Sequence, residues 1–225
     1  MTITIHHIEA RRSERIAWLL EELGVPYDLS FEPGDVMGSG ALMQGVHPVA
    51  MAPVVEDGDE VLIESGAILE TLLNRYGGGR LRPPLESSEH ARYLEWLHYA
   101  EGTAMARFQL EAVQSRLPPS KNPEVQKRRV GVSARILKFI DDTLARQPFL
   151  AGSEFTAADI QMQFVIRIGV SIAAGELGVP SAMLQPSDRA FTPYPHIWAY
   201  MQRLKLRPAF QRMMARTMPQ GWPVI

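Results

Sequence analysis

Hydrophobic positions in the first part of the chain change their spacing several times. Isoleucines alternate with polar residues over 2–7, the period of a half-buried strand, and apolar residues then recur at helical spacing over 13–23. Gly24 ends this helix, and a second alternating run follows over 27–31. Strand, helix and strand over this length form a βαβ unit, in which the crossover implies a parallel pair.

A hairpin and a helix follow. Two short apolar runs, Val54-Val55 and Val61-Leu62-Ile63, flank Asp57-Gly58-Asp59, a composition typical of a tight hairpin turn. Ser65 precedes a run that is apolar on one helical face, so we expect it to cap this helix. The N-terminus of such a helix offers backbone donors to an anion.

The order of these elements identifies the first domain. The glycine-rich segment 32–47 predicts a short irregular helix, which makes the order β-α-β-α-β-β-α up to the glycines at 77–79. This is the order of a thioredoxin-like α/β domain.

The rest of the chain predicts only helices. Pro83-Pro84 indicates a linker, and Thr156 with Asp159 has the pattern of a capping box before a helix that is apolar on most sides. We therefore expect a thioredoxin-like domain over 1–79, a linker over 80–88 and an all-α helical domain over 89–225. The expected helices of the second domain cover 89–117, 125–146, 156–172, 196–206 and 208–217.

Composition and charge argue against several classes of function. The 225 residues carry a formal charge of −2, which argues against a nucleic-acid or anionic-membrane partner. The chain contains no cysteine, and no apolar run approaches the ~20 residues that span a bilayer. It begins without the pattern of a signal peptide, so we expect a soluble cytoplasmic protein. His6 and His7 have no further ligand at metal-like spacing, and we expect no metal site.

Two motifs in order suggest a family. Ala52-Pro53-Val54 followed by Glu64-Ser65-Gly66-Ala67-Ile68 resembles the glutathione-binding half of the glutathione transferase superfamily. The resemblance continues through the segments 6–27, 93–102 and 207–210 and through the capping box, which is a structural element in that family. It implies glutathione as cosubstrate and a symmetric homodimer.

The resemblance also implies roles for these residues. In the family the proline is cis, the backbone that follows it, here that of Val54, pairs with the cysteinyl part of glutathione, and the acidic-Ser pair holds its γ-glutamyl end. Carried over, these roles fall on Ala52, Pro53 and Val54 and on Glu64 and Ser65. The family reaction is attack by the glutathione thiolate on a small hydrophobic electrophile.

The chain departs from the family where the thiol is activated. Close relatives read S-R-S-x-R at the start of the first helix, and here the stretch is Arg11-Arg12-Ser13-Glu14-Arg15. Alignment on the last arginine places Arg11 at the catalytic serine. A neutral hydrogen bond nets only ~1 kcal/mol, less than the ~1.4 kcal/mol needed to lower a pKa by one unit. A guanidinium ~4 Å from sulfur gives as much as ~4 kcal/mol at an effective dielectric constant of ~20.

Two other residues compete with Arg11 for this role. Arg12 is the second candidate, and Ser13 is the third if the loop shifts by two residues. For Ser13 we favour the alternative role of N-cap of the first helix. The alternative for both arginines is a solvated surface pair bonded to Glu9 or Glu14.

A second departure affects affinity. Relatives have a lysine for the glycyl carboxylate of glutathione where this chain has Met51. In this chain Gln44, His47, Arg11 or Arg12 would have to bind this carboxylate in place of the lysine. Loss of one such partner weakens binding by about 1–3 kcal/mol, or ~10- to 100-fold.

The electrophile and the reaction class stay open at this point. Four residues are candidates for an electrophile pocket between the domains, but for them we favour the alternative that they are helical core; they are Tyr99, Met105, Phe108 and Trp222. Two other functions compete with transfer. One is a glutathione- or ligand-binding protein with little activity, and the other is glutathione-dependent reduction of peroxides or disulfides.

Overall fold

The chain forms two compact units. The computed structural model describes residues 2–129, 131–176 and 186–221. Among the described residues, one unit comprises 2–84 and 203–221, and the other lies between Leu85 and Gln202. The break after Pro84 falls within the expected linker, but the C-terminal helix packs with the first unit instead of the second.

A four-stranded mixed sheet is the centre of the first unit. Strands β1 (Ile3–His6) and β2 (Tyr27–Ser30) are parallel, and β1 pairs antiparallel with β3 (Val54–Asp57), which pairs antiparallel with β4 (Glu60–Ile63). The strand order is β2-β1-β3-β4. The predicted βαβ unit and hairpin are confirmed.

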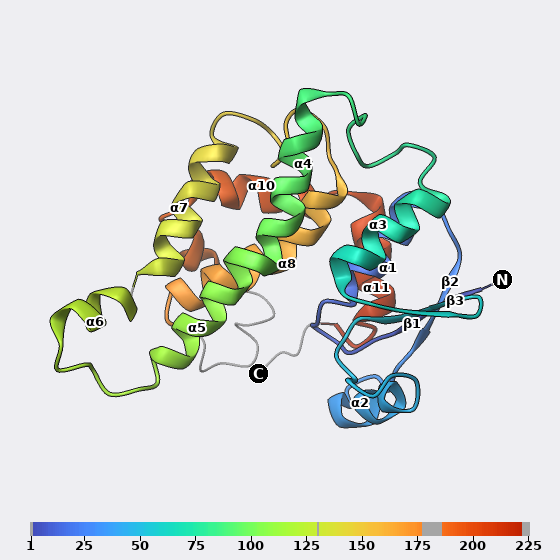
Figure 1. The fold of residues 1–225 in the computed structure, drawn as a ribbon, viewed down its shortest axis with the longest axis horizontal. Coiled ribbons are helices and arrows are strands. Elements are labelled where there is room, and N and C mark those ends of the chain that lie inside the picture. The colour runs from blue at the N-terminus through green and yellow to red at the C-terminus, as the bar shows by residue number, and fades with distance from the viewer. Residues whose placement is uncertain (1, 130, 177–185, 222–225) are drawn as a thin grey trace. The chain divides into compact units, whose positions relative to one another are not determined.

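Helices cover both faces of this sheet (Figure 1). Helices α1 (Glu14–Leu23), α3 (Ser65–Tyr76) and α11 (Pro208–Thr217) lie on one face, and α2 (Val36–Gln44) lies on the other. Alternation in the strands determines which face is apolar, because residues two apart point the same way. The order β-α-β-α-β-β-α and the thioredoxin-like fold are therefore as predicted.

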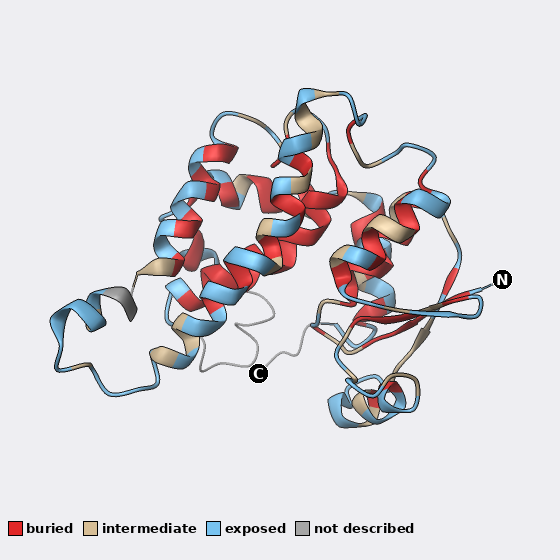
Figure 2. Cartoon of the chain, viewed as in Figure 1, coloured by how far each residue is buried: buried red, intermediate tan, exposed pale blue. Residues whose placement is uncertain are grey.

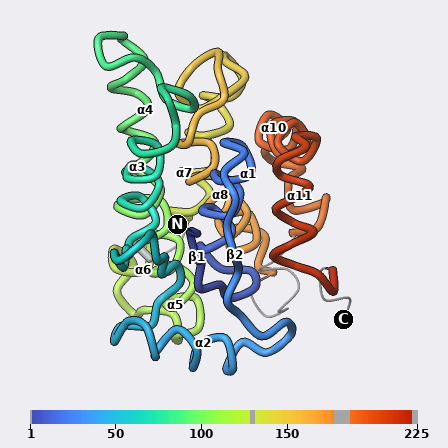
Figure 3. Tube along the Cα trace, turned by 90° about the vertical axis from the view of Figure 1, so that its right-hand side faces the viewer, coloured from blue at the N-terminus to red at the C-terminus, as the bar shows by residue number. Residues whose placement is uncertain are grey.

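Helix α11 packs along α1, although the two are far apart in sequence (Figure 3). The rings of Trp18 and Phe210 meet edge to face with centroids 4.9 Å apart. Beside them Arg207 donates to both carboxylate oxygens of Glu22, from Nε at 2.6 Å and from Nη2 at 2.8 Å. An aromatic contact and a bidentate ion pair therefore hold the C-terminal helix on the first unit.

The second unit is helical, as predicted. The helices are α4 (Ser88–Tyr99), the π-helical turn η1 (Ala100–Met105), α5 (Ala106–Gln114), α6 (Pro123–Arg129), α7 (Val132–Leu144), α8 (Ala157–Ala173), the 3₁₀ turn η2 (Asp188–Phe191) and α10 (Pro195–Lys205). Helix α8 is buried along nearly its whole length and forms the core (Figure 2). Among the described residues no helix is long and apolar enough to cross a membrane.

The structure corrects one predicted helix. The stretch 125–146 is not a single helix, because Gly131 adopts a φ of +73° and separates α6 from α7. Glycine takes this left-handed conformation without steric cost. The carboxylate of Glu111, on α5, accepts hydrogen bonds from the backbone N–H groups of Gly131 and Ser133 at 2.8 and 2.6 Å. A side chain from another helix therefore caps the start of α7.

The predicted capping box is confirmed. Thr156 and Asp159 exchange the reciprocal bonds of the motif at the start of α8. The Asp159 carboxylate also accepts from the Leu150 backbone N–H at 2.9 Å and from the Tyr200 hydroxyl at 3.0 Å. These bonds connect the ends of three segments, so the role of Asp159 is structural.

Packing in the second unit predicts the result of adding a single methyl group. A Cβ at Gly169, on α8, would overlap the ring of Phe108, on α5, whereas a Cβ at Gly102, in η1, would meet nothing within 4 Å. We expect Gly169→Ala to destabilise the protein by about 1–3 kcal/mol, because overpacking forces a backbone or ring shift. Gly102→Ala is the matched control and should be neutral or stabilising by up to ~1 kcal/mol. Urea unfolding measures both, and equal effects of the two substitutions would contradict this packing.

Candidate functional site

Three segments of the first unit leave the sheet at the same end. His6, the last residue of β1, is opposite Val54, the first residue of β3, and Val54 is also opposite Ile63, the last residue of β4. The loop 8–13 therefore begins beside the turn that precedes Val54. The start of α3, which follows β4 after one residue, lies at the same end.

The turn before β3 contains a cis peptide bond between Ala52 and Pro53, as the family resemblance implies. Val54 is fully buried and has a strand partner on each side. Ala52 lies outside the sheet and is partly exposed. The expectation that the Val54 backbone is free to pair with an extended ligand is therefore wrong, because neighbouring strands pair with it on both sides. Of the three candidates in this turn, Ala52 is the residue whose backbone lies outside the sheet and is best placed for that role.

The predicted capping role of Ser65 is wrong. Helix α3 begins at Ser65 itself, and the residue in the N-cap position is Glu64, whose side chain makes no capping bond. Glu64 is exposed and has a φ of +68°. Its carboxylate therefore stands at the surface, next to the backbone donors of the α3 N-terminus.

A buried arginine explains why Ser65 does not cap the helix. Arg15 is 2% exposed, and its Nη1 donates to Ser65 Oγ at 2.8 Å. Because a guanidinium only donates, Ser65 Oγ is the acceptor in this bond. A buried cation, a hydroxyl donor and a helix N-terminus together favour a bound carboxylate.

Arg15 was not among the residues that the sequence singled out for function. Its only signal was its place in the pattern shared with the S-R-S-x-R relatives, where it served to align the loop. A buried position for this charge follows from contacts that one sequence does not show.

The loop 8–13 carries all three activation candidates, two of which are arginines. Arg11 is exposed, and its Nη1 donates to the carbonyl oxygen of Ala10 at 3.1 Å. Arg12 is half-buried. Both precede the N-terminus of α1, so their charges add to the positive end of the helix dipole.

Ser13, the third candidate, lies inside the protein. It occupies the N-cap position of α1, as predicted, but its side chain is 0% exposed and makes no capping bond. Its Oγ lies 2.8 Å from Nδ1 of His7 and accepts from the Ile8 backbone N–H at 3.3 Å. The other ring nitrogen of His7 lies 2.9 Å from the carbonyl oxygen of Thr217.

These contacts fix the direction of each proton. The Thr217 carbonyl oxygen only accepts, so Nε2 of His7 carries a hydrogen. Burial lowers the pKa of His7, against the hydrogen bond to Thr217 and the charges of Glu14 and Glu9. The ring is therefore neutral and its Nδ1 is an acceptor. The hydroxyl hydrogen of Ser13 goes to this nitrogen at 2.8 Å in preference to its other acceptor, the Ile8 carbonyl oxygen at 3.3 Å. This geometry favours an arginine over Ser13 as the group that meets a ligand sulfur.

Backbone strain is concentrated around the site. Four described residues other than glycine have positive φ, and three of them adjoin these segments: Ala10 at +56°, Ala50 at +48° and Glu64 at +68°. Such conformations cost about 1–3 kcal/mol each and persist where the surroundings impose them, often at ligand sites.

The remaining candidates have other surroundings. Met51 is 68% exposed, and Nδ1 of His47 accepts from the Val49 backbone N–H at 3.3 Å. Met105 and Phe108 are buried in the helical unit, in agreement with the alternative that they are core. Trp222 lies outside the described residues. In the part of the chain that the structure describes, no three His, Asp or Glu side chains are grouped to hold a metal ion.

Comparisons with known families agree with this architecture. Residues 6–80 match the family described as glutathione S-transferase, N-terminal domain. Residues 105–208 match the family described as glutathione S-transferase, C-terminal domain.

Individual relatives cover most of the chain. Glutathione S-transferase 3 of Schizosaccharomyces pombe is 33% identical over 177 residues, which are 73% of each chain. Glutathione S-transferase 3 of Zea mays is 28% identical over 212 residues, 89% of this chain and 87% of the relative.

Solved structures show the same fold. A glutathione S-transferase from Actinobacillus pleuropneumoniae superposes with a TM-score of 0.77 at 24% identity, over 96% of this chain and 93% of the other. A theta class enzyme from Xanthomonas axonopodis pv. citri, solved with glutathione bound, superposes with a TM-score of 0.64 at 27% identity, over 94% and 96% of the two chains. The chain belongs to the glutathione S-transferase superfamily.

Proposed function

We propose that this protein is a glutathione transferase that joins the glutathione thiolate to a small hydrophobic electrophile. The observation that carries the proposal is the start of α3. There the buried Arg15 donates a hydrogen bond to Ser65, and the exposed Glu64 is the preceding residue. This arrangement is complementary to an α-amino acid group, which has a carboxylate and an ammonium on one carbon.

Glutathione ends in such a group at its γ-glutamyl residue. Its α-carboxylate would accept from the Ser65 hydroxyl and from the α3 backbone, and its ammonium would meet the Glu64 carboxylate. The cysteinyl part would pair with the backbone of Ala52 beside Pro53, which directs the thiol toward the loop 8–13.

Arg11 would then stabilise the thiolate. It is exposed, and one of its five N–H donors is engaged by the carbonyl oxygen of Ala10. With a chlorinated aromatic acceptor the thiolate attacks the ring carbon, a C–S bond forms, the C–Cl bond breaks and chloride leaves with the electron pair. The thiol proton passes to solvent when the thiolate forms.

The proposal includes a symmetric homodimer, which the family resemblance implies. The partners are glutathione and the electrophile, and no role for a metal, nucleic acid or membrane is proposed. The size of the particle in solution, measured by light scattering after gel filtration, tests the dimer separately from the chemistry.

Calorimetric titration with glutathione tests the binding site. We expect Ser65→Ala to weaken binding by about 1–3 kcal/mol, or roughly 10- to 100-fold, because the carboxylate loses a donor. Ser171→Ala is the matched control, since it removes a buried hydroxyl in the helical unit, bonded to the Arg167 carbonyl oxygen at 3.2 Å. The proposal fails if the parent protein does not bind glutathione, or if both substitutions weaken binding equally.

Thiolate absorbance measured against pH tests the activating group. We expect Arg11→Ala to raise the pKa of the bound thiol by about one unit, since about 1.4 kcal/mol of preference for the thiolate is lost. Arg11→Ser restores the hydroxyl of the relatives and should recover part of that change. An unchanged thiol pKa in Arg11→Ala would remove Arg11 from the mechanism. Glutathione binding without turnover of a chlorinated aromatic acceptor would identify a ligand-binding protein.

A further inference from the structure

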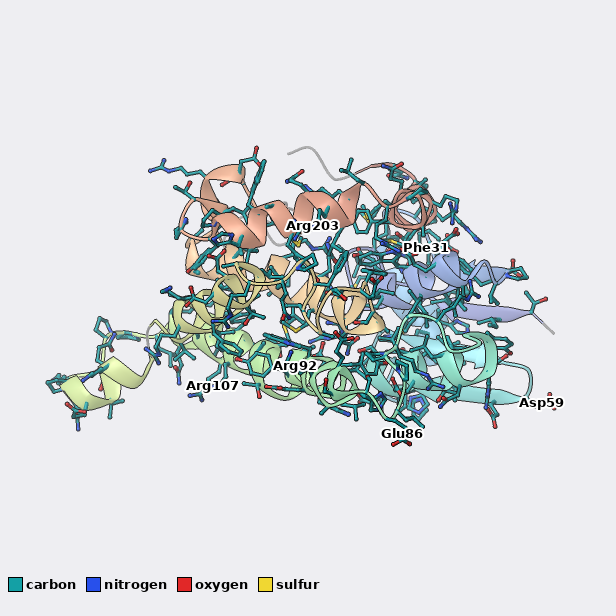
Figure 4. The ribbon with its side chains drawn as sticks, turned by 90° about the horizontal axis from the view of Figure 1, so that it is seen from above. Phe31, Asp59, Glu86, Arg92, Arg107 and Arg203 are labelled. Carbon is teal, nitrogen blue, oxygen red and sulfur yellow. The ribbon has the colours of Figure 1, made fainter. Side chains whose placement is uncertain are left out.

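His7 connects the last helix of the chain to the loop that carries Arg11. Its ring is 0% exposed, and its two nitrogens contact segments more than 200 residues apart in sequence, Ser13 on one side and Thr217 on the other. Phe31, labelled in Figure 4, packs edge-on against the ring with centroids 4.8 Å apart. The imidazole is therefore held in one orientation.

The contact with Ser13 closes the loop. Ser13 Oγ accepts from the Ile8 backbone N–H at 3.3 Å, so the two ends of the loop 8–13 are joined through one hydroxyl. The hydroxyl can accept there because its hydrogen is directed to His7. Ala10, with its positive φ, and Arg11 lie between these two ends.

The contact with Thr217 uses the backbone of α11. Thr217 is the last residue of this helix, where carbonyl groups have no partner within the helix. The Thr217 hydroxyl donates instead to the Met213 carbonyl oxygen at 2.9 Å. The position of the carbonyl that His7 meets therefore depends on how α11 packs on α1, through Phe210 and Arg207.

Simpler roles for His7 do not fit these observations. A general base needs access to substrate, but this ring is inaccessible and both of its nitrogens are hydrogen-bonded within the protein. Its neutral state matters because a proton on Nδ1 would end the donation from Ser13.

We propose that His7 is a positioning residue, which holds the loop 8–13 and with it the Arg11 guanidinium at a place set by the docked C-terminal helix. The consequence for thiol activation rests on the proposed function. The coupling of the loop to α11 is independent of it, and can be measured without glutathione.

Three variants separate the two contacts. His7→Phe keeps the ring and removes both hydrogen bonds. His7→Asn places an amide near the position of Nδ1, where it can accept from Ser13, but it is too short to reach Thr217. Thr217→Ala keeps the carbonyl and removes only the hydroxyl, so it is the control.

In the glutathione complex we expect His7→Phe to raise the pKa of the bound thiol by about one unit and to lower kcat about tenfold at neutral pH. Glutathione affinity should change less than about threefold, because Ser65 is held by Arg15 and not by His7. His7→Asn should move the thiol pKa in the same direction, and Thr217→Ala should leave it unchanged. A thiol pKa that stays constant while thermal stability falls would overturn the proposal, because it would show that His7 only supports the fold.

Amide hydrogen exchange without ligand provides the second measurement. We expect residues 8–13 to exchange at least tenfold faster in His7→Phe and His7→Asn than in Thr217→Ala and the parent. If His7→Phe does not fold, His7→Asn alone decides. Unchanged exchange in 8–13 would refute the coupling even if the protein proves to bind glutathione. Faster exchange in a protein that does not bind glutathione would support the coupling and refute the transferase.

Discussion

The hydrogen bond from Arg15 to Ser65 joins the first turn of α1 to the first turn of α3, and the site depends on it. Burial of a guanidinium is costly, and a hydrogen bond offsets part of that cost, so the bond from Arg15 to Ser65 constrains how the two helices approach each other. The loop 8–13 leads into α1, and Glu64 is the residue directly before α3. The bond between Arg15 and Ser65 therefore fixes the loop 8–13 and Glu64 relative to each other. The cis-proline turn is aligned with them by the pairing of Val54 with His6 and Ile63.

Much of the fold follows from local patterns. The change from alternating to helical spacing predicted each element of the first unit, and the crossover between β1 and β2 predicted their parallel pairing. Local patterns did not predict those features that depend on a side chain far away in the sequence. The break at Gly131 depends on Glu111 from another helix. The place of α11 depends on partners such as Glu22, 185 residues before Arg207.

The site shows the same division between local and distant effects. The motif identified Pro53, Glu64 and Ser65 as neighbours, and the structure places their segments at one end of the sheet. It also predicted capping roles for Ser13 and Ser65, because serine before a helix is usually a cap. In both cases a buried partner takes the hydroxyl, His7 in one and Arg15 in the other. A local preference worth about 1 kcal/mol is outweighed by the need to satisfy a buried polar group.

The association of α11 with the first unit has a consequence during synthesis. When the sheet and its first three helices have left the ribosome, the surface of Trp18 that Phe210 will cover has no partner, because the chain from Arg203 onward has not been made. Roughly 120 residues separate the two parts of this unit. At elongation rates of about 5–20 residues per second, that surface waits roughly 6–24 s for its partner. For this interval chaperones or other nascent chains have access to the side of α1 that the protein's own last helix later covers.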